Sequence, residues 1–182
     1  MRRITAALLV LLFVLTACND TKNSPGVDLM PKIKENTMNI SSPAFEENTL
    51  MPRKYSCQGD DINPPLKIRD VPAGTKSLAL IVDDPDAPMG VWDHWLLWNI
   101  PVISEIAENS VPKDAVQGVN GFGDIRYGGP CPPSGTHRYF FRLYALDTVL
   151  VIQEGATRYS LESAMQNHVL AKTQLIGLYR KS

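Results

Sequence analysis

Proline and glycine divide most of this chain into short segments, and this division limits the folds that are open to it. The 182 residues include 14 prolines and 12 glycines, which separate short extended runs from Asn39 onward. Such punctuation is typical of strands that are joined by turns. We therefore expect a mainly β domain.

Two runs carry the clearest strand signals. Residues 77–82, SLALIV, form a continuous apolar run between Gly74 and Pro85, which indicates a strand covered on both faces. In residues 137–146, HRYFFRLYAL, apolar side chains occupy both alternating sets of positions, so this strand is expected in the interior of a sheet. Residues 94–100 predict a further strand.

A helical period occurs only late in the chain. Ser160 can cap a helix that begins at Leu161, in which apolar side chains recur at helical spacing. His168 falls on the apolar face of this helix, where packing is its expected role. The sequence thus predicts one or two short helices near the C-terminus, with no internal repeat and no second domain.

Residues 1–17 have the features of a bacterial lipoprotein signal peptide. Arg2 and Arg3 precede an apolar run that is too short to span a bilayer well, and the run ends in LTAC at Cys18. Cleavage would leave Cys18 as the lipid-carrying first residue, whereas an ordinary signal peptide or a plain anchor would give Cys18 no role. We expect a protein of the bacterial cell envelope, held on the periplasmic side of the inner or outer membrane through lipidated Cys18.

The segment after the signal peptide predicts a tether. Residues 18–37 are polar and turn-rich, which leaves residues 38–182 as a single globular domain. Removal of residues 1–17 takes away two arginines and no acidic residue, so 16 basic and 19 acidic side chains remain, a net charge of −3. Because no basic stripe remains, nucleic-acid binding is not expected.

Cys57 and Cys131 are the two cysteines that remain besides Cys18. In an exported protein they are candidates for one disulfide. The alternative is a pair of free thiols that pack in the core as small hydrophobic side chains. Export favours the disulfide, and the alternative stays open.

One candidate ligand-binding segment follows the apolar strand 77–82. Asp84 and Asp86 are two residues apart, where the strand gives way to a proline-fixed turn, and His94 opens the next strand after Trp92. If neighbouring strands bring these side chains together, they can line one small cavity. Aspartates beside prolines also serve as simple turn formers, and His94 could be a buried core imidazole.

The second candidate segment is residues 126–141, which are dense in glycine and proline. The backbone N–H groups exposed by Gly128, Gly129 and Gly135 could form an anion-binding nest, while His137 and Tyr139 share one face of the following strand. A carboxylate near a histidine raises the pKa of the imidazole, which can then carry charge near neutral pH. Charged imidazoles and a nest suit a phosphate-like oxyanion, and a nearby carboxylate suits an amine.

Catalysis and metal binding are less well supported. The chain has no G-x-S-x-G or H-E-x-x-H motif and no evident activated nucleophile, so no catalytic residue is assigned and a binding protein is favoured over a phosphate-ester hydrolase. Two histidines with aspartates could in principle bind zinc. Since a tyrosine and a glycine nest favour anions instead, we expect neither a metal nor a cofactor.

The two segments also carry a family resemblance. At DDPDAP and HW (residues 83–95) and at GGPCPPSGTHRYFF (128–141), the sequence resembles phosphatidylethanolamine-binding proteins of the Raf kinase inhibitor-like type, in particular their bacterial YbhB/YbcL branch. The resemblance covers about residues 38–180. It implies an antiparallel β-sandwich with a small anion pocket.

The resemblance further implies a set of pocket residues and a class of ligand. The corresponding side chains here are Asp84, Asp86, Trp92, His94, Pro132, Gly135, His137 and Tyr139. The implied ligand is a small phosphorylated molecule or a phospholipid head group. Because the wider family includes inhibitors and signalling modulators, a partner protein such as a kinase or protease is an alternative. Kinase inhibition itself is not transferred, since no C-terminal extension that would cover the pocket is evident.

Overall fold

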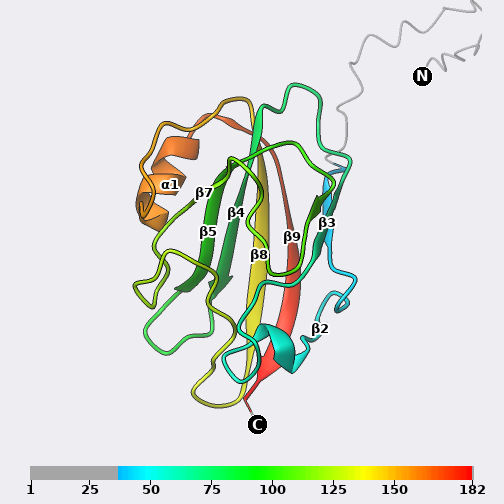
Figure 1. Cartoon of the computed structure of the whole chain (residues 1–182), viewed down its shortest axis with the longest axis vertical. Helices are drawn as coiled ribbons and strands as arrows, with labels where there is room; N and C mark the ends of the chain where they lie inside the picture. Colours follow the sequence, from blue (N-terminus) through cyan, green and yellow to red (C-terminus); the bar gives the residue numbers. More distant parts are fainter. Residues whose placement is uncertain (1–36, 182) are drawn as a thin grey trace, which may run out of the picture. The chain divides into compact units, whose positions relative to one another are not determined.

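In the computed structural model, residues 37–181 are described. The predicted signal peptide, the predicted lipidation site Cys18 and the predicted tether up to residue 36 lie outside this range. Within it, the domain contains two β-sheets, one α-helix and a short 3₁₀ helix at Arg53–Tyr55 (Figure 1). The prediction of a mainly β, sandwich-like fold with a helix near the C-terminus is confirmed.

The two sheets differ in size. The smaller has three antiparallel strands, in spatial order β1 (Asn39–Ser41), β3 (Leu66–Arg69) and β6 (Glu105–Ile106). The larger has six, in spatial order β2 (Thr49–Leu50), β9 (Val169–Arg180), β8 (Thr136–Leu146), β4 (Ser77–Asp84), β5 (Trp92–Ile100) and β7 (Val116–Gln117). All neighbours in this sheet are antiparallel except β2 and β9, which pair in parallel.

Strand β4 is buried along its whole length, as its continuous apolar run predicts. Leu80 and Val82 face the core between the two sheets. Ala79 and Ile81 face a second apolar cluster, which includes residues of α1 (Arg158–Met165). Removal of both faces from water is the main stabilising contribution of such a strand. Strand β8 lies between β9 and β4, which confirms its predicted interior position.

The helix differs from its prediction at both ends. Its N-cap is Thr157, whose side chain accepts a hydrogen bond from the backbone N–H of Ser160, so Ser160 is not the cap. The helix ends at Met165 because Asn167 takes a left-handed conformation (φ 66°) and β9 then pairs with β8. His168 is therefore not on an apolar helix face. It is half-exposed, and its Nδ1 lies 2.8 Å from Asp147 Oδ1.

Candidate ligand-binding pocket

The order of three strands brings the candidate side chains together. Strand β4 pairs with β5 on one side and with β8 on the other. Asp84 ends β4, His94 lies near the start of β5, and His137 lies near the start of β8. Since both pairings are antiparallel, these three positions meet at one end of the sheet.

A β-bulge sets the direction of His94. In the β4–β5 ladder, Asp83 pairs with Asp93 and Val82 pairs with Trp95, so His94 is an extra residue in β5. Such a bulge re-aims side chains and is common beside functional sites. It allows Trp95 to enter the core between the sheets directly after His94, so Trp95 does not contribute to the pocket.

Asp84, His94 and His137 line a cavity of about 310 Å³. One part of its lining is polar, and the remainder is apolar and includes the exposed side chains of Met89 and Phe122. The full lining consists of Asp84, Ala87, Pro88, Met89, Trp92, His94, Phe122, Cys131, Pro133 and His137. A cavity of this size lies at the lower end of the range for small-molecule sites.

His137 and Asp84 form a buried pair at the polar end. His137 Nδ1 lies 2.7 Å from Asp84 Oδ2, and both side chains are almost completely buried. The other carboxylate oxygen, Asp84 Oδ1, accepts a hydrogen bond of 2.8 Å from the backbone N–H of Asp86. Asp84 thereby fixes the orientation of the His137 ring, and it can compensate a positive charge on that ring.

The pKa of His94 shifts in the opposite direction from the one that the sequence predicts. Its Nδ1 donates to the carbonyl oxygen of Gly128 at 2.6 Å. Burial lowers the pKa of His94, and this outweighs the opposing effects of the Gly128 carbonyl and of the negative charge of Asp84. The expectation that nearby acids would keep this imidazole charged near neutral pH is therefore wrong for His94.

Tyr139 packs against His94, and Asp84 and the backbone of Cys131 lie near its hydroxyl. The two rings pack edge to face, with centroids 5.1 Å apart. Tyr139 is buried, and its hydroxyl has no hydrogen-bond partner among residues 37–181. Burial, followed by the negative charge of Asp84, raises its pKa, so the phenol remains protonated. A buried donor of this kind can donate to a ligand, because nothing in the described protein already satisfies it.

Gly128 and Gly129 do not contribute free N–H groups to the predicted anion-binding nest. The N–H of Gly128 donates to the carbonyl of His94 at 2.9 Å, and the N–H of Gly129 donates to Asp61 Oδ1 at 2.6 Å. Both groups are thus used inside the protein. The reason for glycine is close packing: a Cβ at Gly128 would lie 2.8 Å from the ring of Phe122.

Four predicted pocket residues do not line the cavity: Tyr139, which packs against His94, and Asp86, Pro132 and Gly135. Asp86 points to Arg138, which donates to both carboxylate oxygens at 2.9 and 2.7 Å and lowers the pKa of Asp86 to about 2. Pro132 is buried nearby, while Pro133 reaches the cavity. Gly135 is exposed and takes a positive φ of 71°, so it serves the turn before β8.

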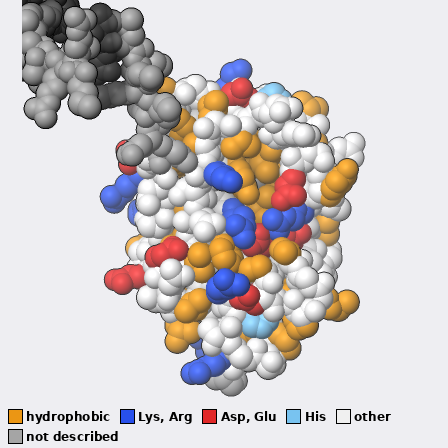
Figure 2. All heavy atoms as spheres, turned by 180° about the vertical axis from the view of Figure 1, so that it is seen from behind, with side chains coloured by type: hydrophobic (Ala, Val, Ile, Leu, Met, Phe, Trp, Pro, Cys, Tyr) orange, Lys and Arg blue, Asp and Glu red, His pale blue; other side chains and the backbone are white. Residues whose placement is uncertain are grey.

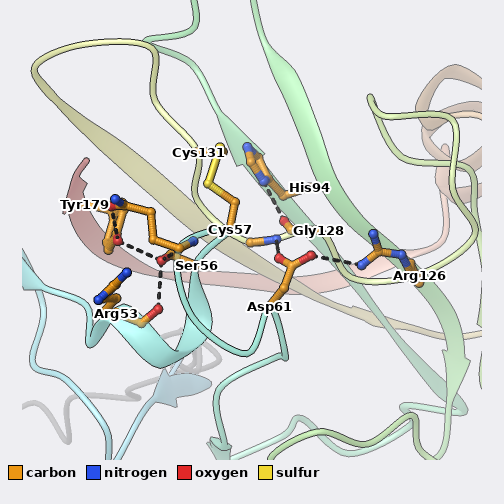
Figure 3. The surroundings of a disulfide bond; sticks show 11 residues. Arg53, Ser56, Cys57, Asp61, His94, Arg126, Gly128, Cys131 and Tyr179 are labelled. Carbon is orange, nitrogen blue, oxygen red and sulfur yellow. Dashed lines mark hydrogen bonds and ion pairs between the residues drawn. A yellow bond between two sulfur atoms is a disulfide. The ribbon is translucent and has the colours of Figure 1, made fainter. Parts of the chain in front are cut away.

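A disulfide holds the loop on which His94 depends. Cys57 and Cys131 are bonded, with Cα atoms 5.4 Å apart, and the N–H of Cys57 donates to the carbonyl of Pro130. Figure 3 shows this link beside Asp61, whose carboxylate contacts the N–H of Gly129 on one side and Arg126 on the other. The carbonyl that orients His94 therefore belongs to a loop fixed at several points.

Phe122 and Met89 are pocket residues that sequence reasoning missed. The Phe122 ring packs edge-on against Trp92 and His94, with both centroid distances at 5.5 Å. Asn120 Oδ1 accepts hydrogen bonds from the N–H groups of Phe122 and Asp124, which shapes the turn. An aromatic residue between two glycines, GFG at 121–123, was a usable signal in the sequence.

Outside the pocket, the described surface has no evident metal site or membrane-spanning helix. In the view from behind, basic and acidic side chains are interspersed (Figure 2). Residues 37–181 contain no group of three or more histidine, cysteine, aspartate or glutamate side chains that could hold a metal ion. Within the same residues, no helix has the length and apolar character needed to cross a bilayer.

Comparison with known proteins agrees with this architecture. The family model for phosphatidylethanolamine-binding protein matches residues 41–180. A UPF0098 protein of Methanothermobacter thermautotrophicus is 51% identical over 150 residues, which make up 79% of this chain and 99% of that protein. A UPF0098 protein of Chlamydia muridarum is 47% identical over 150 residues, again 79% of this chain and 99% of the relative.

Two crystal structures are similar in fold. CT736 of Chlamydia trachomatis, described as a phosphatidylethanolamine-binding protein homologue, has a TM-score of 0.78 at 47% identity, covering 81% of this chain and 99% of that one. YbcL of E. coli, described as a new member of the mammalian PEBP family, has a TM-score of 0.75 at 28% identity, covering 80% and 99%. The chain therefore belongs to the phosphatidylethanolamine-binding protein family.

Proposed function

We propose that this protein is a lipid-anchored protein of the bacterial cell envelope whose pocket binds phosphate or phosphoethanolamine-like groups. The observation that carries the proposal is the meeting of His94, His137 and Asp84, from three adjacent strands, around one cavity. The likeness to YbcL supports a place in the bacterial YbhB/YbcL branch.

The chemistry of the cavity suits a small oxyanion. Asp84 occupies Nδ1 of His137, so Nε2 is the ring nitrogen left to meet a ligand, and the hydroxyl of Tyr139, a residue outside the cavity lining, is a donor without a hydrogen-bond partner among residues 37–181. Charge-assisted hydrogen bonds to oxyanions are the stronger kind. The apolar side chains of Trp92 and Phe122 can contact the organic part of a ligand.

A titration of the purified domain with phosphoethanolamine tests this function. The chain has three histidines, and the third, His168, lies on the surface with Asp147. We expect the imidazole NMR signals of His94 and His137 to move with saturation, while those of His168 stay in place as the internal control. Signals of His94 and His137 that stay unmoved at several millimolar ligand would count against the proposal.

The membrane anchor is tested separately through Cys18. The argument for it is the sequence of residues 1–18, an arginine-flanked apolar run that ends in LTAC. We expect the full-length protein to fractionate with membranes and to incorporate labelled palmitate, and Cys18→Ala to lose the label. Labelling that persists in Cys18→Ala would refute the lipoprotein assignment. It would leave the proposed ligand binding by the pocket unaffected.

A second candidate function is modulation of a partner protein. It is favoured by exposed apolar side chains beside the pocket, Met89 at 92% and Val91 at 57% exposure. Hydrolysis has less support, because the cavity lining contains no serine, threonine or lysine, and Cys131 is in a disulfide. A partner captured equally well by the native chain and by Met89→Ser/Val91→Ser would exclude this surface.

A further inference from the structure

The hydrogen bond of His94 determines what its second ring nitrogen can do. The carbonyl of Gly128 can only accept, so the contact at 2.6 Å requires the proton on Nδ1. Figure 3 shows the other nitrogen, Nε2, directed away from this carbonyl. The side-chain hydrogen bond of His94 to Gly128 is made by Nδ1 and not by Nε2. In a neutral imidazole this atom is a hydrogen-bond acceptor.

The surroundings of His94 keep the ring neutral. Its side chain is almost completely buried, and the rings of Tyr139 and Phe122 pack against it. The negative charges of Asp84 and Asp93 and the carbonyls of Gly128 and Gly129 favour a second proton, but burial outweighs them and lowers the pKa. The cavity therefore offers an acceptor where an oxyanion would ordinarily require a donor.

Asp84 adds a second constraint on the ligand. Its carboxylate is buried and lines the same cavity, so a doubly charged anion would be repelled. His137 Nδ1 lies 2.7 Å from this carboxylate, and the cavity lining contains no lysine or arginine that could offset a second negative charge on the ligand. Both features favour an oxyanion that is singly charged and that brings its own proton.

We propose that the pocket selects a phosphomonoester in its monoanionic form, whose P–OH donates to Nε2 of His94 while an unprotonated oxygen accepts from His137. This inference rests on the proposed function, since it assumes that an oxyanion binds in the cavity. A sulfate ester has the same shape and no proton to donate at this pH, and a phosphodiester, as in a phospholipid head group, has none either. Either would leave Nε2 of His94 without a donor from the ligand.

Three ethanolamine compounds test the selection by calorimetry with the native chain. Phosphoethanolamine is the monoester, ethanolamine O-sulfate is its isosteric sulfate, and glycerophosphoethanolamine is the diester that represents a lipid head group. At a pH near 6, where a phosphomonoester is about half monoanionic, we expect phosphoethanolamine to bind at least about tenfold more tightly than either. Equal affinity for the sulfate, or tighter binding of the diester, overturns the selection and leaves anion binding intact. No binding of any compound overturns both.

A matched pair of variants separates His94 from general effects. In His94→Asn, the amide nitrogen replaces Nδ1 and can still donate to Gly128, whereas the acceptor Nε2 is removed. We expect the preference for the monoester to narrow to about threefold or less. His168→Asn, the same change on the surface histidine, should keep the full preference. A preference that survives in His94→Asn contradicts the role of Nε2. If the variant does not fold, the three ligands measured with the native chain decide whether the pocket selects the monoester.

Discussion

Asp83 and Asp84 are consecutive residues whose buried carboxylates serve opposite faces of β4. Asp84 lines the cavity and binds His137. Asp83, which is fully buried, accepts hydrogen bonds from Arg142 and from Arg158 at the start of α1. The alternation of a strand is sufficient to separate the two roles. One acid belongs to the site, and the other attaches the helix to the sheet behind it.

Replacement of Asp83 should affect stability more than binding. Asp83→Asn leaves two arginines without their shared counter-charge, and loss of one partner in a buried ion pair costs about 3 kcal/mol or more. We expect a lower free energy of unfolding in urea, with phosphoethanolamine binding retained below the transition. The control is Asp147→Asn, which removes a half-exposed carboxylate and should cost at most about 1 kcal/mol. Equal losses in both variants would contradict the assigned role of Asp83.

Tyr139→Phe should weaken ligand binding and leave stability almost unchanged, which is the opposite of the effect expected for Asp83→Asn. Because the Tyr139 hydroxyl has no partner in the described protein, its removal should change the free energy of unfolding by less than about 0.5 kcal/mol and weaken phosphoethanolamine binding about fivefold or more. Tyr127→Phe is the matched control, since the Tyr127 hydroxyl donates to the carbonyl of Tyr55 at 3.0 Å. It should lose about 1 kcal/mol of stability and keep its affinity. The reverse pattern would refute a ligand contact by Tyr139.

The disulfide should stabilise both the fold and the pocket. Cys57 and Cys131 are 74 residues apart, and a cross-link over a loop of this length contributes about 4 kcal/mol through the unfolded state. We expect Cys57→Ala/Cys131→Ala to unfold at lower guanidinium concentration. Because the bond holds the loop of Gly128, the NMR signals of His94 should also shift. Unchanged signals of His94 would show that the loop is fixed without the disulfide.

The ion pair of Asp86 and Arg138 predicts a specific acid dependence. Hydrogen bonding to Arg138 lowers the pKa of Asp86 from 3.8 to about 2. Since the pKa is lower in the folded state, the pair stabilises the protein above about pH 4, and this contribution is lost as the pH falls toward about 2. In Arg138→Gln, the carboxyl-carbon NMR titration of Asp86 should move back toward its ordinary midpoint. Arg69→Gln, on the other sheet, should leave it unchanged, and an unchanged midpoint in Arg138→Gln would contradict the pairing.

The strands that frame the pocket could be predicted because their patterns are local. The apolar run of 77–82 and the alternation of 137–146 follow from periodicity, and the two-residue spacing of His137 and Tyr139 follows from the strand geometry. The helix end could not be predicted in the same way. Residues 166–172 continue a helical pattern, but pairing of β9 with β8 is a long-range contact that overrides it.

The electrostatics of the pocket also depend on contacts between distant segments. The neutral state of His94 follows from its burial, and the position of its ring proton follows from the carbonyl of Gly128, which lies 34 residues further along the chain. The hydrogen bond from the N–H of Gly129 to Asp61 joins residues that are 68 positions apart. Neither contact leaves a pattern in the sequence, so a nest that uses the N–H groups of Gly128 and Gly129 and a charged imidazole at His94 were reasonable expectations that tertiary structure overturned.

A crystal structure of the domain with phosphoethanolamine would show whether the pocket binds the phosphate. We expect the phosphate to occupy the cavity, with oxygens within hydrogen-bond distance of Nε2 of His94, Nε2 of His137 and the hydroxyl of Tyr139. A phosphate bound elsewhere, with this cavity filled only by solvent, would contradict ligand binding by the pocket.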